Sequence, residues 1–310
     1  MTAALDRPSI GAVFTQWTLQ PLAVVAVVAL AAWYVRGVRR STRAGRAWPV
    51  GRSVTFGVGL ALLLWASCGF LGTYAYSLFW VWTSQQLALW LVVPIVVLSG
   101  APLQLARDLG GRGGRVDRLL RSRPVRFVSN PLVGPALVPL LSFALFFGPL
   151  PGWSIGTPVV GWLLQLVLVA IGAIMVLPLV GVDDDVSSLA VGLGLAIGSF
   201  ELVIDALPGI VLRLRTQLAT TFFDHRAALD WSPNALHDQQ IAGAIVWCIA
   251  ELIDLPFLLL VFRRWLRVDA KDAARVDAVL EAERSARGAE TDEPWWLSDP
   301  SMQQRLKRRD

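Results

Sequence analysis

The sequence contains few of the residues that bind soft metals or build disulfide frameworks. Its 310 residues include only two Cys, two His and three Met. Cys68 and Cys248 lie far apart and form no CxxC spacing, which argues against a disulfide-stapled fold. We find no glycine-rich phosphate-binding loop and no Ser/His/Asp arrangement. The sequence therefore predicts that the protein is not an enzyme.

Charge is also scarce, and the shortage is concentrated in long stretches. Charged residues make up 16% of the chain, whereas soluble proteins carry about 25%. No charged residue occurs in Pro8–Val35, Ser53–Ala106 or Phe127–Val182. One bilayer crossing needs roughly 20 apolar residues, so the first stretch can hold one helix and each of the others two. This pattern predicts an integral membrane protein surrounded by lipid.

Turn signals and charges divide the apolar sequence into seven predicted transmembrane helices. We therefore expect an all-α fold with a seven-helix membrane domain over residues 21–262. An N-terminal segment (1–20) precedes this domain, and a polar tail (263–310) follows it. The spans are expected at residues 21–35, 53–72, 78–99, 131–147, 159–180, 189–212 and 239–262.

The segments between the spans carry further predictions. Gly148–Pro158 is rich in Pro and Gly, which favours a turn between the fourth and fifth spans. In the tail, Lys271–Arg287 has the pattern of an amphipathic helix.

Arginine sets the predicted orientation. The loop after the first span and the loop Ala101–Asn130 are rich in Arg, whereas Asp183–Asp185 form a short acidic loop. Because Lys and Arg in short loops remain on the cytoplasmic side, we expect the N-terminus outside and the C-terminus in the cytoplasm. The protein would then be a multi-pass protein of a bacterial plasma membrane. Orientation explains the net charge of +5 better than a nucleic-acid partner does.

The last two predicted spans differ from the first five because they contain acids. Glu201 and Asp205 lie four residues apart, and Glu251 and Asp254 lie three apart, so each pair shares one helix face. An acid within a bilayer is costly and usually faces a partner, water or a functional path. The acids could form a cation or proton site, or they could be protonated and join two helices by hydrogen bonds. The residues alone leave both interpretations open.

The start of the seventh predicted span carries a polar motif. At His237-Asp238 we expect Asp238 to cap its own helix by accepting a backbone N–H at the positive helix end. The following block resembles the signature of the CtaG family, bacterial cytochrome c oxidase assembly proteins with seven membrane helices. Its motif residues are Asp238, Gln239, Gln240, Gly243 and Trp247, followed by Glu251.

Other segments extend the resemblance to roughly residues 20–265. Leu91–Pro94 together with Gly100–Pro102 looks like a second family motif, and Asn130–Leu132 and Gly172 with Pro178 are weaker matches. The resemblance implies copper delivery to the copper-containing subunit of the oxidase.

The chain departs from the family at the expected metal ligands. Family members carry two His four residues apart in the third span and a His-containing stretch near the fifth. These positions fall on Trp82 and Gln86, and around Gly161 and Gln165. Imidazole suits copper, while Gln is a poor substitute and Trp is none.

The resemblance therefore leaves two interpretations. Either the chain is an assembly scaffold that has lost copper binding, or it holds copper elsewhere. The side chains available for the second are His237, Cys248, Cys68, Glu201 and Glu251.

Two functional hypotheses follow, beside the possibility that the protein is a structural membrane protein with no ligand. The first is a non-catalytic membrane protein that helps to assemble cytochrome oxidase by contacting respiratory subunits. The second is an ion or small-solute transporter that uses the four intramembrane acids.

Overall fold

The computed structural model describes residues 5–110, 118, 122–123, 133–180, 188–227 and 229–287. Most of the basic loop Ala101–Asn130, the acidic loop Asp183–Asp185 and the tail from 288 onward lie outside the described residues. The chain divides into two units, Met1–Asp184 with Ala196–Phe257 and Asp185–Leu195 with Leu258–Asp310. The site discussed below lies within the first unit.

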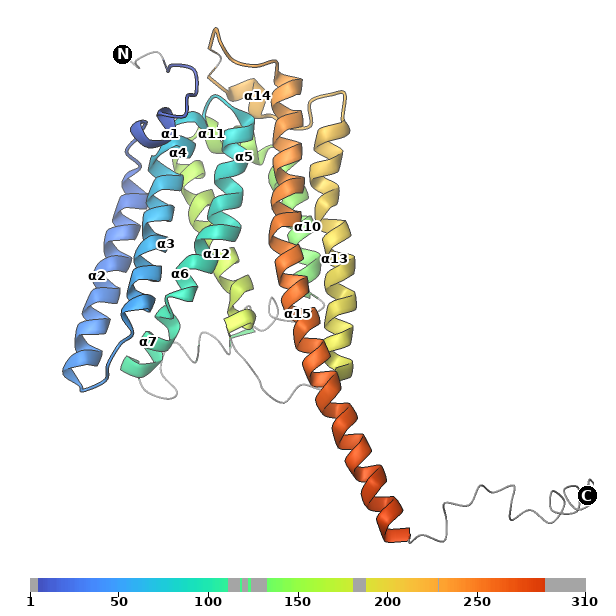
Figure 1. Ribbon diagram of the computed structural model, residues 1–310. Coiled ribbons are helices and arrows are strands. Elements are labelled where there is room, and N and C mark those ends of the chain that lie inside the picture. The colour runs from blue at the N-terminus through green and yellow to red at the C-terminus, as the bar shows by residue number, and fades with distance from the viewer. Residues whose placement is uncertain are drawn as a thin grey trace, which may run out of the picture. The chain divides into compact units, whose positions relative to one another are not determined.

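Every regular element in the described part is a helix, so the all-α prediction is confirmed there (Figure 1). The helices are α1 (Ala12–Thr15), α2 (Pro21–Arg43), α3 (Val50–Cys68), α4 (Phe70–Tyr74), α5 (Phe79–Leu87), the π-helix η1 (Ala88–Val92), α6 (Val93–Ser99), α7 (Pro102–Gly110), α10 (Val133–Phe146), α11 (Leu150–Gly156), α12 (Pro158–Val180), α13 (Ser188–Leu214), α14 (Phe222–His225) and α15 (Ala235–Arg287).

Several helices are suited to cross a membrane. Within the described residues, four segments are long and apolar enough: Pro21–Arg43, Val50–Tyr74, Phe79–Ser99 and Pro158–Val176. A fifth arises if α10 and α11, which bend by 57° at their junction, are counted as one span. The protein is therefore a multi-pass membrane protein. The number seven and the orientation remain predictions, although the residues of the sixth and seventh predicted spans are helical in α13 and α15.

One expected element is wrong. Gly148–Pro158 was expected to be a turn, yet it contains the helix α11. Proline at the start of a helix costs little because its missing N–H would have no partner there, and α11 places proline in its first turn. α15 runs without a break from the residues of the predicted seventh span to Arg287, so Lys271–Arg287 is helical as expected.

The third predicted span is one helix interrupted by a π-helical turn. α5 passes through η1 into α6, and Pro94 stands just beyond η1. A proline ring clashes with the carbonyl four residues earlier, which here belongs to Trp90. The wider π turn is one way in which a helix accommodates such a mismatch. α12 packs against this turn, and a Cβ on Gly172 would lie 1.8 Å from the carbonyl oxygen of Trp90.

We therefore expect Gly172→Ala to destabilise the protein by about 1–3 kcal/mol, because α12 must move away from Trp90 to make room. Gly57→Ala in α3 is the matched control, since no atom lies within 4 Å of a Cβ there. The control should leave stability unchanged or raise it by up to ~1 kcal/mol, because Ala favours a helix over Gly. Thermal unfolding in one detergent measures both variants. Equal melting temperatures would show that the contact is not tight.

Candidate functional site

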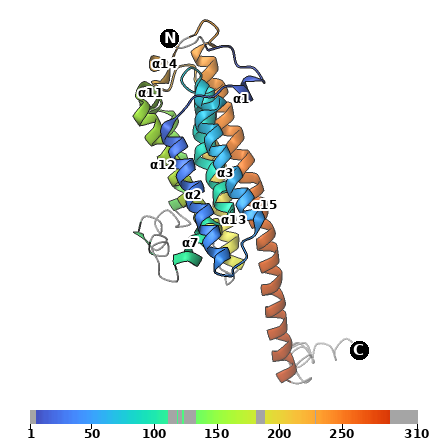
Figure 2. The same cartoon turned by 90° about the vertical axis from the view of Figure 1, so that its left-hand side faces the viewer.

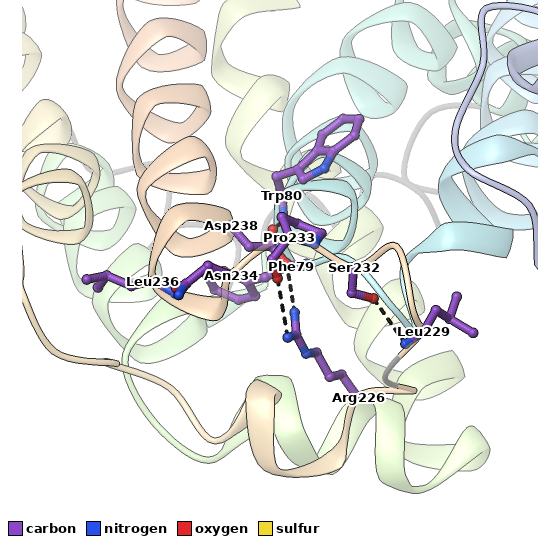
Figure 3. Close-up of polar contacts among 9 residues, drawn as sticks. All are labelled: Phe79, Trp80, Arg226, Leu229, Ser232, Pro233, Asn234, Leu236 and Asp238. Carbon is purple, nitrogen blue, oxygen red and sulfur yellow. Dashed lines mark hydrogen bonds and ion pairs between the residues drawn. The ribbon is translucent and has the colours of Figure 1, made fainter.

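Asp238 is fully buried and joins the start of α15 to the start of α5 (Figure 3). Its Oδ2 accepts the N–H of Phe79 at 3.0 Å, and its Oδ1 accepts the N–H of Trp80 at 2.9 Å. The first N–H groups of a helix have no partner within that helix, and its N-terminus carries a partial positive charge. The carboxylate therefore satisfies both needs of α5. Arg226 completes the arrangement at 3.4 Å from Oδ2.

The expectation that Asp238 caps its own helix is thus wrong. α15 begins at Ala235, and Asn234 acts as the cap by accepting the N–H of Leu236 on its Oδ1 at 2.8 Å. Asp238 lies within the first turn of α15 and directs its carboxylate to α5 instead. An acid near a helix start suits either role, so the local sequence could not decide between them.

Burial of the Asp238 carboxylate costs free energy unless hydrogen-bond donors and a positive charge compensate it. Asp238 precedes the predicted seventh span, and burial raises its pKa above the ordinary value. The N–H groups of Phe79 and Trp80, and then the charge of Arg226, lower that pKa in part. A buried carboxylate that lost these donors would carry a large desolvation penalty. We call Asp238, Arg226 and the N–H groups of Phe79 and Trp80 the α5 clamp.

The other motif residues fix further parts of the fold to α15. Gln239 is fully buried. Its Oε1 accepts the N–H of Ala219 at 2.7 Å, and its Nε2 donates to the carbonyl of Gln217 at 3.1 Å. Gln239 therefore holds the connection between α13 and α14. Gln240 is half-buried.

Gly243 allows α15 and α13 to approach closely. A Cβ at this position would lie 2.5 Å from the backbone nitrogen of Arg213 and 2.8 Å from the carbonyl oxygen of Gly209. Trp247, by contrast, is exposed, and its indole nitrogen lies 3.4 Å from Glu251. Most of the motif is thus explained by packing and hydrogen bonding within the chain.

α5, held by the clamp, forms one wall of a small pocket of about 10 Å³. That volume is close to what a single water molecule needs by this measure, about 10–15 Å³. Trp82, Gln86, Gly161 and Gln165 all line the pocket. The family resemblance places paired histidines at Trp82 and Gln86, and it places a further His-containing stretch around Gly161 and Gln165. The structure therefore brings the four positions together, and the lining is completed by Ala75, Tyr76, Gln85, Ser154 and Ile155.

The pocket is organised by neutral hydrogen bonds. The indole N–H of Trp82 donates to Ser154 Oγ at 2.9 Å, and Ser154 donates onward to the carbonyl of Pro151 at 2.8 Å. Gln86 Nε2 donates to Gln85 Oε1 at 3.2 Å, and Gln85 Nε2 donates to the carbonyl of Ala66 at 2.9 Å. Gln86 Oε1 is buried and has no hydrogen-bond partner among the described residues.

The donor set of this pocket does not fit copper. The polar groups lining it are carboxamides, hydroxyls and an indole, and copper sites in proteins use imidazole, thiolate or thioether ligands. Space is limiting as well as chemistry. A Cβ on Gly161 would lie 2.5 Å from the carbonyl oxygen of Ser154, so no imidazole fits there without a shift of α12.

The alternative ligands do not gather in the part of the chain that the structure describes. No group of three or more His, Cys, Asp or Glu suited to a metal occurs there. His237 and Cys248 are exposed and Cys68 is buried in α3. The predicted ligand set remains a prediction, because the side chain of Glu201 lies outside the described residues.

The transporter hypothesis gains no support either. Asp205 is buried within α13, and Glu251 is half-buried beside Trp247. The side chains of Glu201 and Asp254 are not described, so the predicted clustering of the four acids is not observed in the described residues.

The fold and the motif define a helical membrane protein whose signature residues hold its helices together around a small polar pocket. Comparison with known families places it further: residues 32–268 match the model of the cytochrome c oxidase caa3 assembly factor family. The chain belongs to this family.

Relatives with similar sequences occur in mycobacteria. Uncharacterised proteins of Mycobacterium bovis and Mycobacterium tuberculosis are each 26% identical over 283 residues, and one of Mycobacterium leprae is 27% identical. Each alignment covers 87% of this chain but only 42% of the relative, so the chain spans less than half the length of these proteins. No solved structure matches the chain.

The clamp predicts the effect of a conservative substitution. Asp238→Asn keeps the side-chain shape but turns an NH₂ group toward a backbone N–H at the start of α5. We expect a loss of about 2–4 kcal/mol in the free energy of unfolding. Asp230→Asn, at an exposed acid nearby, is the control and should change stability by less than about 0.5 kcal/mol. Thermal unfolding decides the comparison, and an unchanged Asp238→Asn variant would refute the clamp.

Proposed function

We propose that the chain assists the assembly of a cytochrome oxidase in a bacterial plasma membrane as a non-catalytic scaffold. On this proposal it contacts oxidase subunits and passes no copper through the pocket at Gln86. Membership of the assembly factor family supports a role in oxidase assembly. The observation that carries the scaffold role is the pocket itself. The positions at or around which the resemblance places the histidines meet there, yet they present Trp82, Gln86, Gly161 and Gln165.

The internal contacts support a role that needs no metal. The α5 clamp fixes α5 by hydrogen bonds and an ion pair, so protein groups hold this wall of the pocket in place. A scaffold needs a defined surface, and this arrangement supplies one from protein groups alone. Its outward faces are apolar: Val28 on α2 and Val159 and Val167 on α12 are half or more exposed. Such faces can pack against transmembrane helices of a partner.

A deletion strain tests the assembly role. Loss of the gene should at least halve the assembled oxidase, measured by haem absorbance of membranes and by oxygen consumption. The full chain should restore both, and so should Gln86→Ala, because a scaffold does not use the pocket chemically. Asp238→Asn should fail to restore them at a growth temperature at which Asp230→Asn succeeds. Normal oxidase content in the deletion strain would contradict the proposal.

Copper loading tests separately whether the protein binds copper. We expect the purified chain to retain far less than one equivalent of copper after Cu(I) loading and desalting, because the pocket offers carboxamides instead of imidazoles. A Gln86→Ala/Gln165→Ala double variant is the control and should retain the same small amount. One tightly bound equivalent that the double variant loses would place copper in this pocket and overturn the proposal. Elemental analysis of both proteins gives the stoichiometry.

A further inference from the structure

A second cavity of about 70 Å³ lies between α2, α3 and α12. Figure 2 shows α12 beside α2. Because one water needs only about 10–15 Å³ by the same measure, this cavity has room for several non-hydrogen atoms. We call it the α2–α12 slot. Its walls are almost wholly carbon, contributed mainly by Leu22, Ala23, Ala26, Leu63, Leu166 and Val169.

One end of the slot is polar. Gln20 lines it immediately before α2 begins, and only 3% of this residue is exposed. Its Oε1 is buried and has no hydrogen-bond partner among the described residues. A buried acceptor without a donor costs free energy, so the position calls for a group that donates a hydrogen bond. Ser67 and Gln165 also line the slot.

The rest of the slot is apolar and follows the bilayer direction expected for α2. Leu30 also lines it, ten residues along the chain from Gln20. At the rise of an α-helix this separation is about 15 Å. The slot therefore runs from an unsatisfied carboxamide at the end of a candidate span to hydrocarbon within it. A lipid-like molecule has the same order, with its head at the membrane surface and its tail inside.

The chemistry of the lining restricts the class of ligand that the slot can bind. No charged side chain lines the slot, so a charged head would remain uncompensated. α2 is largely uncovered in the structure, with 11% of its most apolar stretch buried, so a molecule in the bilayer can reach the slot from the side. An apolar partner helix would fit less well, because it would leave Gln20 Oε1 without a donor.

We propose that the α2–α12 slot binds a neutral membrane amphiphile, an alkyl chain whose hydroxyl head donates a hydrogen bond to Gln20. The alkyl part lies along Ala23 and Ala26 of α2 and faces Leu166 of α12. This inference goes beyond the assembly role and does not depend on it.

Photolabelling of the purified full chain in nanodiscs tests the proposal. The probe is hexadecan-1-ol with a diazirine in its alkyl chain. We expect saturable labelling of peptides from α2 and α12, and competition by unlabelled hexadecan-1-ol. Its methyl ether, which lacks the donor, should compete about tenfold less well, since one hydrogen bond is lost. Equal competition by the ether would refute the role of Gln20.

Matched variants locate the site. Ala26→Trp fills the slot and should abolish the saturable label. Val28→Trp adds the same bulk on the same helix at a position that is 61% exposed, and it should keep the label. The Gln20→Leu variant should still bind the alkyl chain of the probe, but it should no longer prefer the alcohol to the ether. This variant and the ether comparison decide the question if Ala26→Trp does not fold.

Other outcomes would overturn the proposal. Labelling that does not saturate and spreads over the outward face of α2 would indicate bulk lipid contact. If Ala26→Trp instead loses a co-purified oxidase subunit while hexadecan-1-ol does not compete, the slot is a protein interface.

Discussion

The carboxylate of Asp238 fixes the start of α5, the helix that carries Trp82, Gln85 and Gln86. Two unsatisfied backbone N–H groups, a helix end with positive charge and Arg226 meet one buried acid. The acid would be costly to bury alone, and the N–H groups would be costly to leave unpaired. Each side of the contact therefore requires the other, and together they fix α5 against α15.

The consequences extend along α5. With its first turn fixed, the helix directs Trp82, Gln85 and Gln86 into the small pocket and continues into η1. There Gly172 allows α12 to approach η1 closely at the carbonyl oxygen of Trp90. A contact at the start of α5 thus positions the pocket residues and the turn that packs against Gly172. Gln86 lines the small pocket and Gln20 lines the α2–α12 slot, and Gln165 of α12 lines both.

The sequence predicted the membrane class well because charge-free runs report burial in lipid directly. α2 and α12 begin within one residue of the predicted start of their spans. The motif at Asp238 was also recognised, but its partner was not. The donors lie 158 and 159 residues away, and no local pattern encodes such a pairing. Arg226 was missed as well, although it lies only 12 residues before Asp238, because it stands outside the helices and has no regular spacing to Asp238.

Other features were hidden by conflicting local signals. α11 was mistaken for a turn because proline usually interrupts helices, although it is well tolerated in a first turn. Gln85 and Gln86, adjacent carboxamides in an apolar span, were a visible signal of a polar pocket. The resemblance singled out four of the lining positions, but only the fold shows that they meet.

Hydrogen exchange at the start of α5 tests whether Asp238 holds this helix in place. The amides of Phe79 and Trp80 should exchange slowly in the native protein in nanodiscs, because Asp238 accepts both hydrogens. In Asp238→Asn, a peptide covering the start of α5 should exchange faster while peptides from α2 and α3 stay unchanged. Equal exchange of the α5 peptide in the two proteins would mean that Asp238 does not hold this helix.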